Sequence, residues 1–159
     1  MAETKARIRK FLVYVDDTPE CRLALRFACR RAKHTGGGVT LLRVVVPGDF
    51  QHWMAVEDRM REEALEAAEQ LLHKLAGDVN ESSGIMPELV VREGVPHDAI
   101  LAHIEEDQDI RILVLGAATG SEGPGPLVNL MAGKMAGIMH IPVTVVPGNL
   151  TEAQIDELT

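Results

Sequence analysis

The stretch Phe11-Leu-Val-Tyr-Val-Asp-Asp-Thr-Pro19 decides how this chain of 159 residues is expected to fold. Residues 11–15 form an uninterrupted apolar run, which is typical of a strand buried on both faces in a parallel sheet. Two acidic residues end the run, Thr18 suits a helix N-cap, and Pro19 suits the first helical position. The stretch therefore predicts a strand, a short turn and a helix that reaches about residue 34.

The same alternation of strand and helix continues along the chain. Apolar runs predict four more strands at 39–46, 88–92, 110–115 and 142–146, and helices are expected at 52–76, 97–106 and 127–139. Alternating elements of this kind predict a doubly wound α/β fold, with a parallel sheet and helices on both faces. We expect a five-stranded sheet of order 3-2-1-4-5 in a single domain spanning 1–159. Its core would cover about 8–147, with a C-terminal tail at 148–159.

Two segments carry more detailed expectations. The helix at 52–76 is expected to bury one apolar stripe, and residues 77–84 read as a polar connector; the stripe comprises Trp53, Val56, Met60, Ala64, Ala67, Leu71 and Leu75. In the tail, Thr151 and Gln154 have the spacing of a capping box and predict a short final helix.

Composition excludes several classes of protein. The formal net charge of −8 argues against binding nucleic acid, which requires a basic surface. No apolar run is long enough to span a membrane, and residues 1–10 lack the apolar segment of a signal peptide. Cys21 and Cys29 are eight residues apart in one predicted helix, so they are expected to be unpaired apolar fillers. These features predict a cytoplasmic protein without a membrane span.

The ligand site is expected where the strand order reverses. In open parallel sheets, ligands bind beyond the carboxyl ends of the strands at that point, here between strands 11–15 and 110–115. Asp16-Asp17 follows the first of these strands, and the Gly/Pro-rich loop 116–126 follows the second. From this loop onward, three glycines follow the spacing Gly120-x2-Gly123-x9-Gly133. Glycines allow backbone amides to approach phosphates closely, so the spacing indicates an anion-binding loop.

Other motifs are absent from the sequence. Gly133-Lys134 is not part of a Walker loop, because no glycine lies five residues earlier and Met135 replaces the required Ser or Thr. Asp16-Asp17 resembles the magnesium-binding pair of a receiver domain, but the later strands end without its aspartate and lysine. The histidines lack zinc-site spacing, and no Gly-x-Ser-x-Gly occurs. We therefore expect neither catalytic residues nor a metal site.

Several segments together resemble the universal stress protein family from Phe11 to Val146. They are Val15-Asp16-Asp17-Thr18, Leu42-Arg43-Val44, Gly94-Val95-Pro96, Leu115-Gly116 with the glycine loop, and Pro142-Val-Thr-Val. The resemblance implies an adenine nucleotide alpha hydrolase-like fold and a site for ATP or AMP, with Mg²⁺ only if ATP is bound. It places the matches of Asp16 and Val44 near the adenosine and those of Leu115 and Gly116 beside the ribose. The phosphates would contact the matches of Gly123, Gly133 and Lys134. The full candidate set is Val15, Asp16, Val44, Leu115, Gly116, Gly120, Gly123, Gly133, Lys134 and Met135.

The chain departs from the family pattern in its phosphate loop. Six residues separate Gly116 from Gly123 where the family has two, and Pro124 and Pro126 remove amide donors. Lys134 stands where the family usually has Ser or Thr. The resemblance therefore implies a regulatory, stress-associated protein, with nucleotide binding as the leading hypothesis. The alternatives are a dimeric interaction module that binds no nucleotide, and a slow ATPase for which only Asp16 and Asp17 could serve the chemistry.

The fifth predicted strand is expected to form a homodimer interface. It lies at one edge of the sheet and carries no charge along Val143, Thr144, Val145 and Val146. An uncharged edge strand is a template for pairing, whereas the other edge strand is flanked by charged residues. The alternative is that residues 149–159 fold over this edge.

Overall fold

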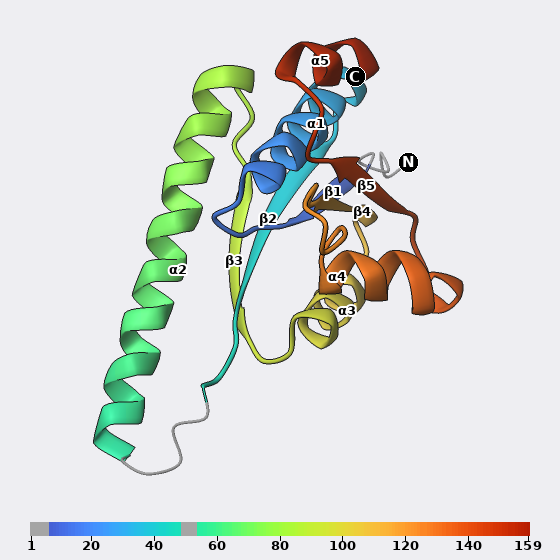
Figure 1. The fold of residues 1–159 in the computed structure, drawn as a ribbon. Coiled ribbons are helices and arrows are strands. Elements are labelled where there is room, and N and C mark those ends of the chain that lie inside the picture. Colours follow the sequence, from blue (N-terminus) through green and yellow to red (C-terminus); the bar gives the residue numbers. More distant parts are fainter. Residues whose placement is uncertain (1–6, 49–53) are drawn as a thin grey trace, which may run out of the picture.

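A computed structural model of the chain describes residues 7–48 and 54–159 (Figure 1). Its centre is a parallel sheet of five strands in the order β3-β2-β1-β4-β5, which confirms the predicted order. The strands are β1 (Lys10–Tyr14), β2 (Gly38–Val45), β3 (Glu88–Glu93), β4 (Ile110–Ala117) and β5 (Val143–Pro147). The order reverses between β1 and β4, so their carboxyl ends are the expected ligand edge.

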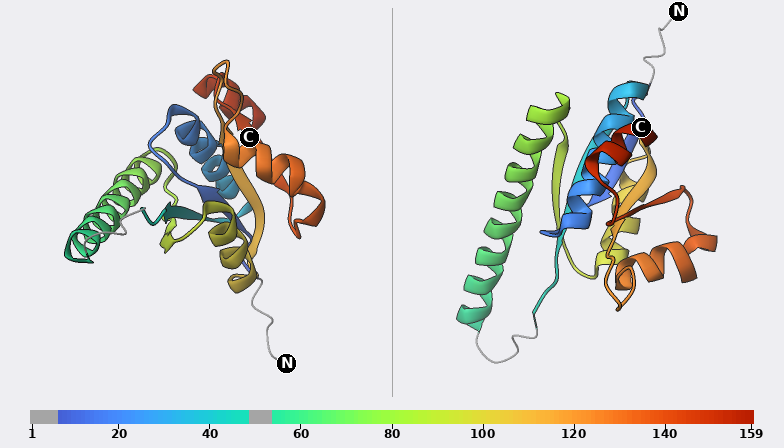
Figure 2. Two further views of the ribbon diagram at one scale, coloured as in Figure 1. Left: turned by 60° about the horizontal axis from the view of Figure 1, so that its bottom comes forward. Right: turned by 45° about the horizontal axis from the view of Figure 1, so that its top comes forward.

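The helices cover both faces of the sheet (Figures 1 and 2). They are α1 (Pro19–Thr35), α2 (Met54–Ser83), α3 (Pro96–Glu106), α4 (Pro126–Asn129) and α5 (Glu152–Leu158). Alternate strand residues point to opposite faces: Val13 packs in a core with α1 and α2, and Leu12 packs in a core with α3 and α4. None of the helices in the described ranges has an apolar stretch long enough to cross a membrane.

The start of α1 forms as its sequence predicts. The backbone N–H of Cys21 donates to the hydroxyl of Thr18 at 3.2 Å, and Pro19 occupies the first helical position. The helix ends at Gly36, whose φ of 70° is left-handed. The predicted apolar face is buried as a unit and comprises Cys21, Ala24, Leu25, Ala28 and Ala32.

The predicted end of α2 near residue 76 is wrong, and residues 77–83 continue the helix instead of forming a connector. An exposed glycine inside a helix, such as Gly77, destabilises the helix by about 1 kcal/mol relative to alanine. Burial of a valine contributes about 1.5–3 kcal/mol, so the buried Val79 more than offsets it. The buried stripe is also displaced: it comprises Ala68, Leu72, Leu75 and Val79, whereas Ala67 is exposed. The predicted contacts of Trp53 and Val56 lie outside the described residues and side chains.

The predicted helix at 127–139 is not one continuous α-helix. After α4, a π-helical turn spans Leu130–Lys134 and a 3₁₀ turn spans Ala136–Ile138. The N–H of Met135 donates to the carbonyl of Leu130, five residues earlier, at 2.8 Å. Two glycines, Gly133 and Gly137, lie in these turns and weaken the α-helical alternative.

The C-terminal helix α5 packs mainly against α1 (Figure 1). Its predicted capping box between Thr151 and Gln154 is confirmed. The guanidinium of Arg26 donates twice to the carboxylate of Asp156, at 2.8 Å each, and Ile155 is fully buried. Because α5 lies on α1, β5 remains an edge strand of the described sheet.

Candidate functional site

A cleft of about 420 Å³ lies at the carboxyl ends of β1 and β4. The starts of α1, α3 and α4 form its other walls. Of the ten predicted site residues, it brings together Asp16, Leu115 and Gly116. Asp16 follows β1, and Leu115 and Gly116 belong to β4, so the fold brings two distant segments together at the expected edge.

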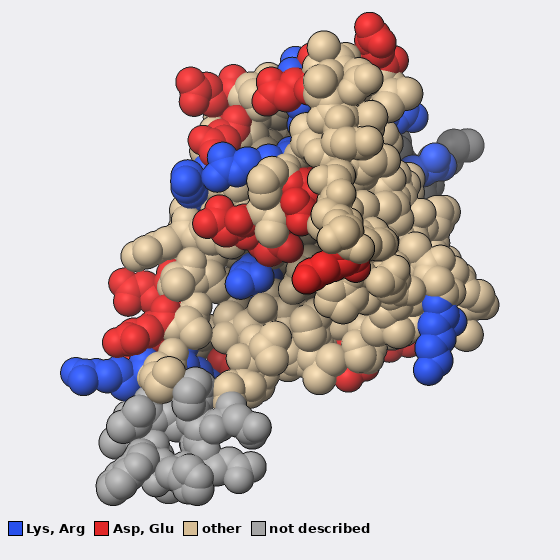
Figure 3. All heavy atoms as spheres, viewed as in Figure 1, with Lys and Arg blue, Asp and Glu red and all other residues tan. Residues whose placement is uncertain are grey.

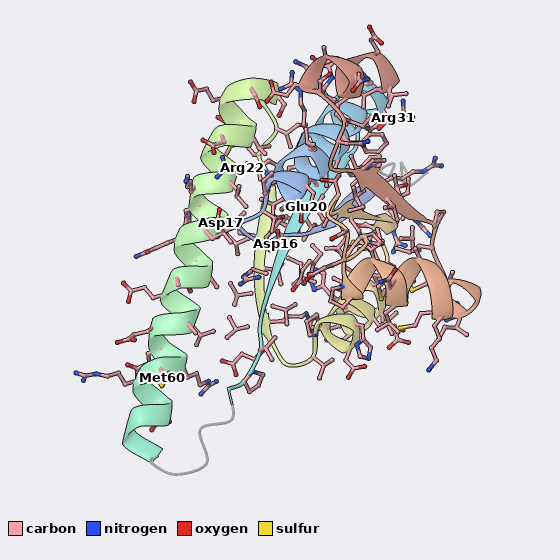
Figure 4. The ribbon with its side chains drawn as sticks, viewed as in Figure 1. Asp16, Asp17, Glu20, Arg22, Arg31 and Met60 are labelled. Carbon is pink, nitrogen blue, oxygen red and sulfur yellow. The ribbon has the colours of Figure 1, made fainter. Side chains whose placement is uncertain are left out.

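Asp16 lines this cleft and lies beside the beginning of α1 (Figure 4). One oxygen of its carboxylate accepts a hydrogen bond from the Thr18 hydroxyl, and its N–H donates to Cys21 Sγ at 3.4 Å. Among the described residues, the other carboxylate oxygen has no hydrogen-bond partner. Asp16 can therefore accept a hydrogen bond from a ligand hydroxyl at this second oxygen while the first oxygen keeps its hydrogen bond from Thr18.

Gly116 allows α1 to approach β4 closely. A Cβ added at this position would lie 2.4 Å from the carbonyl oxygen of Glu20 and 2.6 Å from its carbonyl carbon. Both are backbone atoms of α1, which cannot move without shifting the helix. The glycine thus shapes the cleft through helix–strand packing, and it brings Glu20 to the cleft wall.

Other cleft residues were missed from the sequence. Tyr14 lines the cleft and is half-buried, and this burial raises the pKa of its hydroxyl. The alternation along β1 could have located it, because Tyr14 and Asp16 are two residues apart and face the same side. Pro96 and His97 also line the cleft from the start of α3. They are distant in sequence from the other site residues, and only the fold brings them there.

Gly120 and Gly123 line a neighbouring hollow of about 540 Å³ together with Glu122. This hollow shares Ala118, Gly125 and Pro126 with the cleft, so the two adjoin each other at the loop. The N–H of Gly123 donates to the carbonyl of Gly120 at 3.1 Å, which closes a turn in the loop. Gly123 has a φ of 89°, a left-handed conformation that favours glycine.

The remaining candidates lie elsewhere. Val15 is fully buried in the core beneath α1, and Val44 is buried in the core beneath α3. Gly133 and Lys134 are exposed on the π-helical turn, and Met135 is buried. None of these five is among the described residues that line the cleft.

The two cysteines are not suited to act as nucleophiles, although Cys21 lines the cleft. Both are free and almost fully buried, as expected for apolar fillers. Burial raises the pKa of each thiol to about 12, so neither is an activated nucleophile at neutral pH.

Comparison with known proteins shows which family has this architecture. The model of the Universal stress protein family matches residues 7–147. No curated protein sequence matches the chain.

Three solved structures illustrate the likeness of the fold. The universal stress protein UspA from Lactobacillus plantarum is 21% identical, with a TM-score of 0.71 over 89% of this chain and 99% of that one. The universal stress protein of Archaeoglobus fulgidus in complex with dAMP is 19% identical, with a TM-score of 0.62 over 87% and 98%. A family protein of Arabidopsis thaliana with AMP bound is 17% identical, with a TM-score of 0.57 over 87% and 91%. The matched segment includes the whole sheet, and the chain belongs to the universal stress protein family.

Proposed function

We propose that this protein binds an adenine nucleotide in the cleft between β1 and β4 and acts as a regulatory binding protein. The observation that carries the proposal is the meeting of Asp16, Leu115 and Gly116 in one cleft at this edge. The similar folds from A. fulgidus and A. thaliana hold dAMP and AMP respectively, which supports an adenine nucleotide as the ligand.

The chemistry of the walls suits a nucleoside. The cleft volume of about 420 Å³ lies within the usual range of small-molecule sites. Leu115, Leu127 and the ring of Tyr14 offer apolar surface to a base. The free oxygen of Asp16 would accept hydrogen bonds from ribose hydroxyls, since a carboxylate is a strong acceptor.

ATP and Mg²⁺ form a narrower part of the proposal. Mg²⁺ would enter only with ATP, because it is commonly held by one or two carboxylates together with substrate phosphates. Asp17 does not support catalysis: its side chain is 78% exposed and lies 3.7 Å from Arg22. A regulatory role therefore fits better than a slow ATPase. We place the protein in the cytoplasm, where thiols such as Cys21 and Cys29 stay reduced.

A second candidate function is a homodimeric interaction module. The observation that favours it is the open edge of β5, since α5 packs on α1 and leaves that edge unpaired within the described sheet. The segment Val143–Val146 has no charged residue to prevent pairing with a second copy. On the face in view, the surface around α4 and β5 carries few charged side chains (Figure 3).

Calorimetric titration with AMP and adenosine tests the proposal. A charge-assisted hydrogen bond is worth about 1.5–3 kcal/mol, so Asp16→Asn is expected to weaken AMP binding about tenfold or more. Asp58→Asn, an exposed aspartate on α2, serves as the matched control and should bind AMP like the wild type.

The single tyrosine of the chain provides an independent readout. Binding in the cleft should change the near-ultraviolet absorbance of Tyr14 along the same titration curve. If folded protein binds neither AMP nor adenosine, the nucleotide proposal is refuted and the interaction module remains.

A further inference from the structure

We infer that the cleft selects adenine ligands of low negative charge, a nucleoside or a nucleoside monophosphate, over the triphosphate. This inference rests on the proposed function, because it assumes that the cleft between β1 and β4 holds the ligand. It concerns the electrostatics and hydrogen-bond donors at the place where phosphates would lie.

The carboxylates at the site come from three residues. Asp16 and Glu20 line the cleft, and Glu122 lines the adjoining hollow. Asp16 and Glu20 lie near one another at the start of α1 (Figure 4), and Figure 3 shows acidic side chains between α2 and α4 with basic side chains beside them. Of the described residues that line the cleft and the hollow, none is a lysine or an arginine. Each added phosphate would therefore bring negative charge toward carboxylates, and like charges repel.

The loop also offers few amide donors to a phosphate. Residues 118–126 are nine positions, and two of them, Pro124 and Pro126, have no N–H. Two more are engaged inside the loop: Ala118 N–H donates to Pro124 at 3.1 Å, and Gly123 N–H donates to Gly120 at 3.1 Å. Four of the nine positions thus cannot donate to a ligand without rearrangement of the loop. Anion-binding loops depend on such backbone donors.

Basic side chains near the cleft are already engaged or lie outside it. Arg43 donates to the carbonyl of Val15 at 3.4 Å and lines another hollow with Val44. His97 lines the cleft and lies 3.2 Å from the carboxylate of Asp98. Lys134 is exposed on the π-helical turn and does not line the cleft. Arg22 lies 3.7 Å from Asp17 and lines a different hollow, next to α2. The site therefore offers Asp16 and apolar surface to a nucleoside, whereas no lysine or arginine lines the cleft and four of the nine loop positions cannot donate to a phosphate.

The test is a calorimetric series with adenosine, AMP, ADP and ATP in the presence of a chelator, repeated with Mg²⁺. Without metal, ATP is expected to bind at least tenfold more weakly than the tighter of adenosine and AMP, and Mg²⁺ should reduce the difference. Glu122→Gln and Glu20→Gln remove one negative charge each and should strengthen ATP binding several-fold, while adenosine binding stays within twofold. Glu63→Gln, an exposed glutamate on α2, is the matched control and should leave the whole series unchanged.

The outcomes separate this inference from the proposed function. If ATP binds without metal as tightly as AMP or more tightly, the inference is overturned while nucleotide binding stands. If no member of the series binds, the proposed function fails and the inference fails with it. Glu122 is exposed in a loop, so Glu122→Gln is expected to fold and keeps the test valid if Glu20→Gln does not.

Discussion

Substitution of Gly116 by alanine is expected to destabilise the protein by forcing α1 away from β4. The new Cβ would lie 2.4 Å from the carbonyl oxygen of Glu20 and 3.0 Å from the N of Cys21. Real Cβ atoms essentially never come closer than 3.0 Å to another heavy atom, and the atoms met here belong to the backbone. The first turn of α1 must therefore shift, and the shift also widens the cleft.

The size of the effect follows from the cost of overpacking a close-packed interior. One added methyl group typically costs about 1–3 kcal/mol. For a domain of 150–250 residues, each 1 kcal/mol lowers the melting temperature by about 2–4 °C. Gly116→Ala should therefore melt about 2–12 °C below the wild type when followed by circular dichroism.

The control is Gly120→Ala, in the loop that follows β4. No atom lies within 4 Å of a Cβ added at Gly120, and its φ is not left-handed. Its melting temperature should stay within about 2 °C of the wild type, as expected for a surface change within about 0.5 kcal/mol. An unchanged melting temperature for Gly116→Ala would refute the packing argument. If AMP binding is lost together with stability, the loss reports the position of α1 and not a contact with the ribose.

Three further predictions address the C-terminal helix, the thiols and the edge strand. The hydrogen bond from Arg26 holds the pKa of Asp156 below its ordinary value, and a lowered folded-state pKa stabilises the protein above the unfolded-state value. At pH 7 the wild type should therefore unfold at a higher urea concentration than Asp156→Asn, and this difference in midpoint should shrink below about pH 4. A difference that is as large at pH 2 as at pH 7 would contradict the prediction. Cys21 and Cys29 should resist a thiol reagent in folded protein and react in urea, so rapid labelling of native protein would argue against their burial. Light scattering at micromolar concentration should report a dimer, and Val145→Pro should convert it to a monomer. The parallel register turns the Val145 amide away from β4, so proline would remove a donor to the second copy without removing one to β4. A wild-type monomer would count against pairing through β5.

The strands were predictable because burial on both faces leaves a strong signal in the sequence. The runs beginning at Phe11 and Ile110 contain almost only apolar residues, and both lie at the centre of the sheet. Helix ends were less predictable, since local propensity competes with tertiary packing. Gly77 suggested a stop, but burial of Val79 two residues later continues α2 to Ser83.

The site was predictable only where it follows directly from the ends of strands. Asp16 lies two residues beyond the end of β1, and Gly116 is the next-to-last residue of β4, so the topology alone brings them together. His97 reaches the same cleft from α3, and nothing in its neighbouring sequence indicates this. The acidic side chains of the cleft and the adjoining hollow were equally hidden, because Glu20 and Glu122 are about a hundred residues apart in the chain.

The π-helical turn at Leu130–Lys134 bears on how sequence motifs are matched. An α-helix advances about 100° per residue, so a turn that holds one extra residue changes the direction of every side chain after it by about that angle. The Gly123-x9-Gly133 spacing counts residues along the chain, but it does not fix where the last glycine faces. Two sequences with the same spacing can therefore direct their final residues to helix faces that differ by about 100°. A deletion of one residue between Leu130 and Lys134 would restore the α-helical phase, so homologous segments that differ in length by one residue here are expected to place different side chains on the same face of the helix.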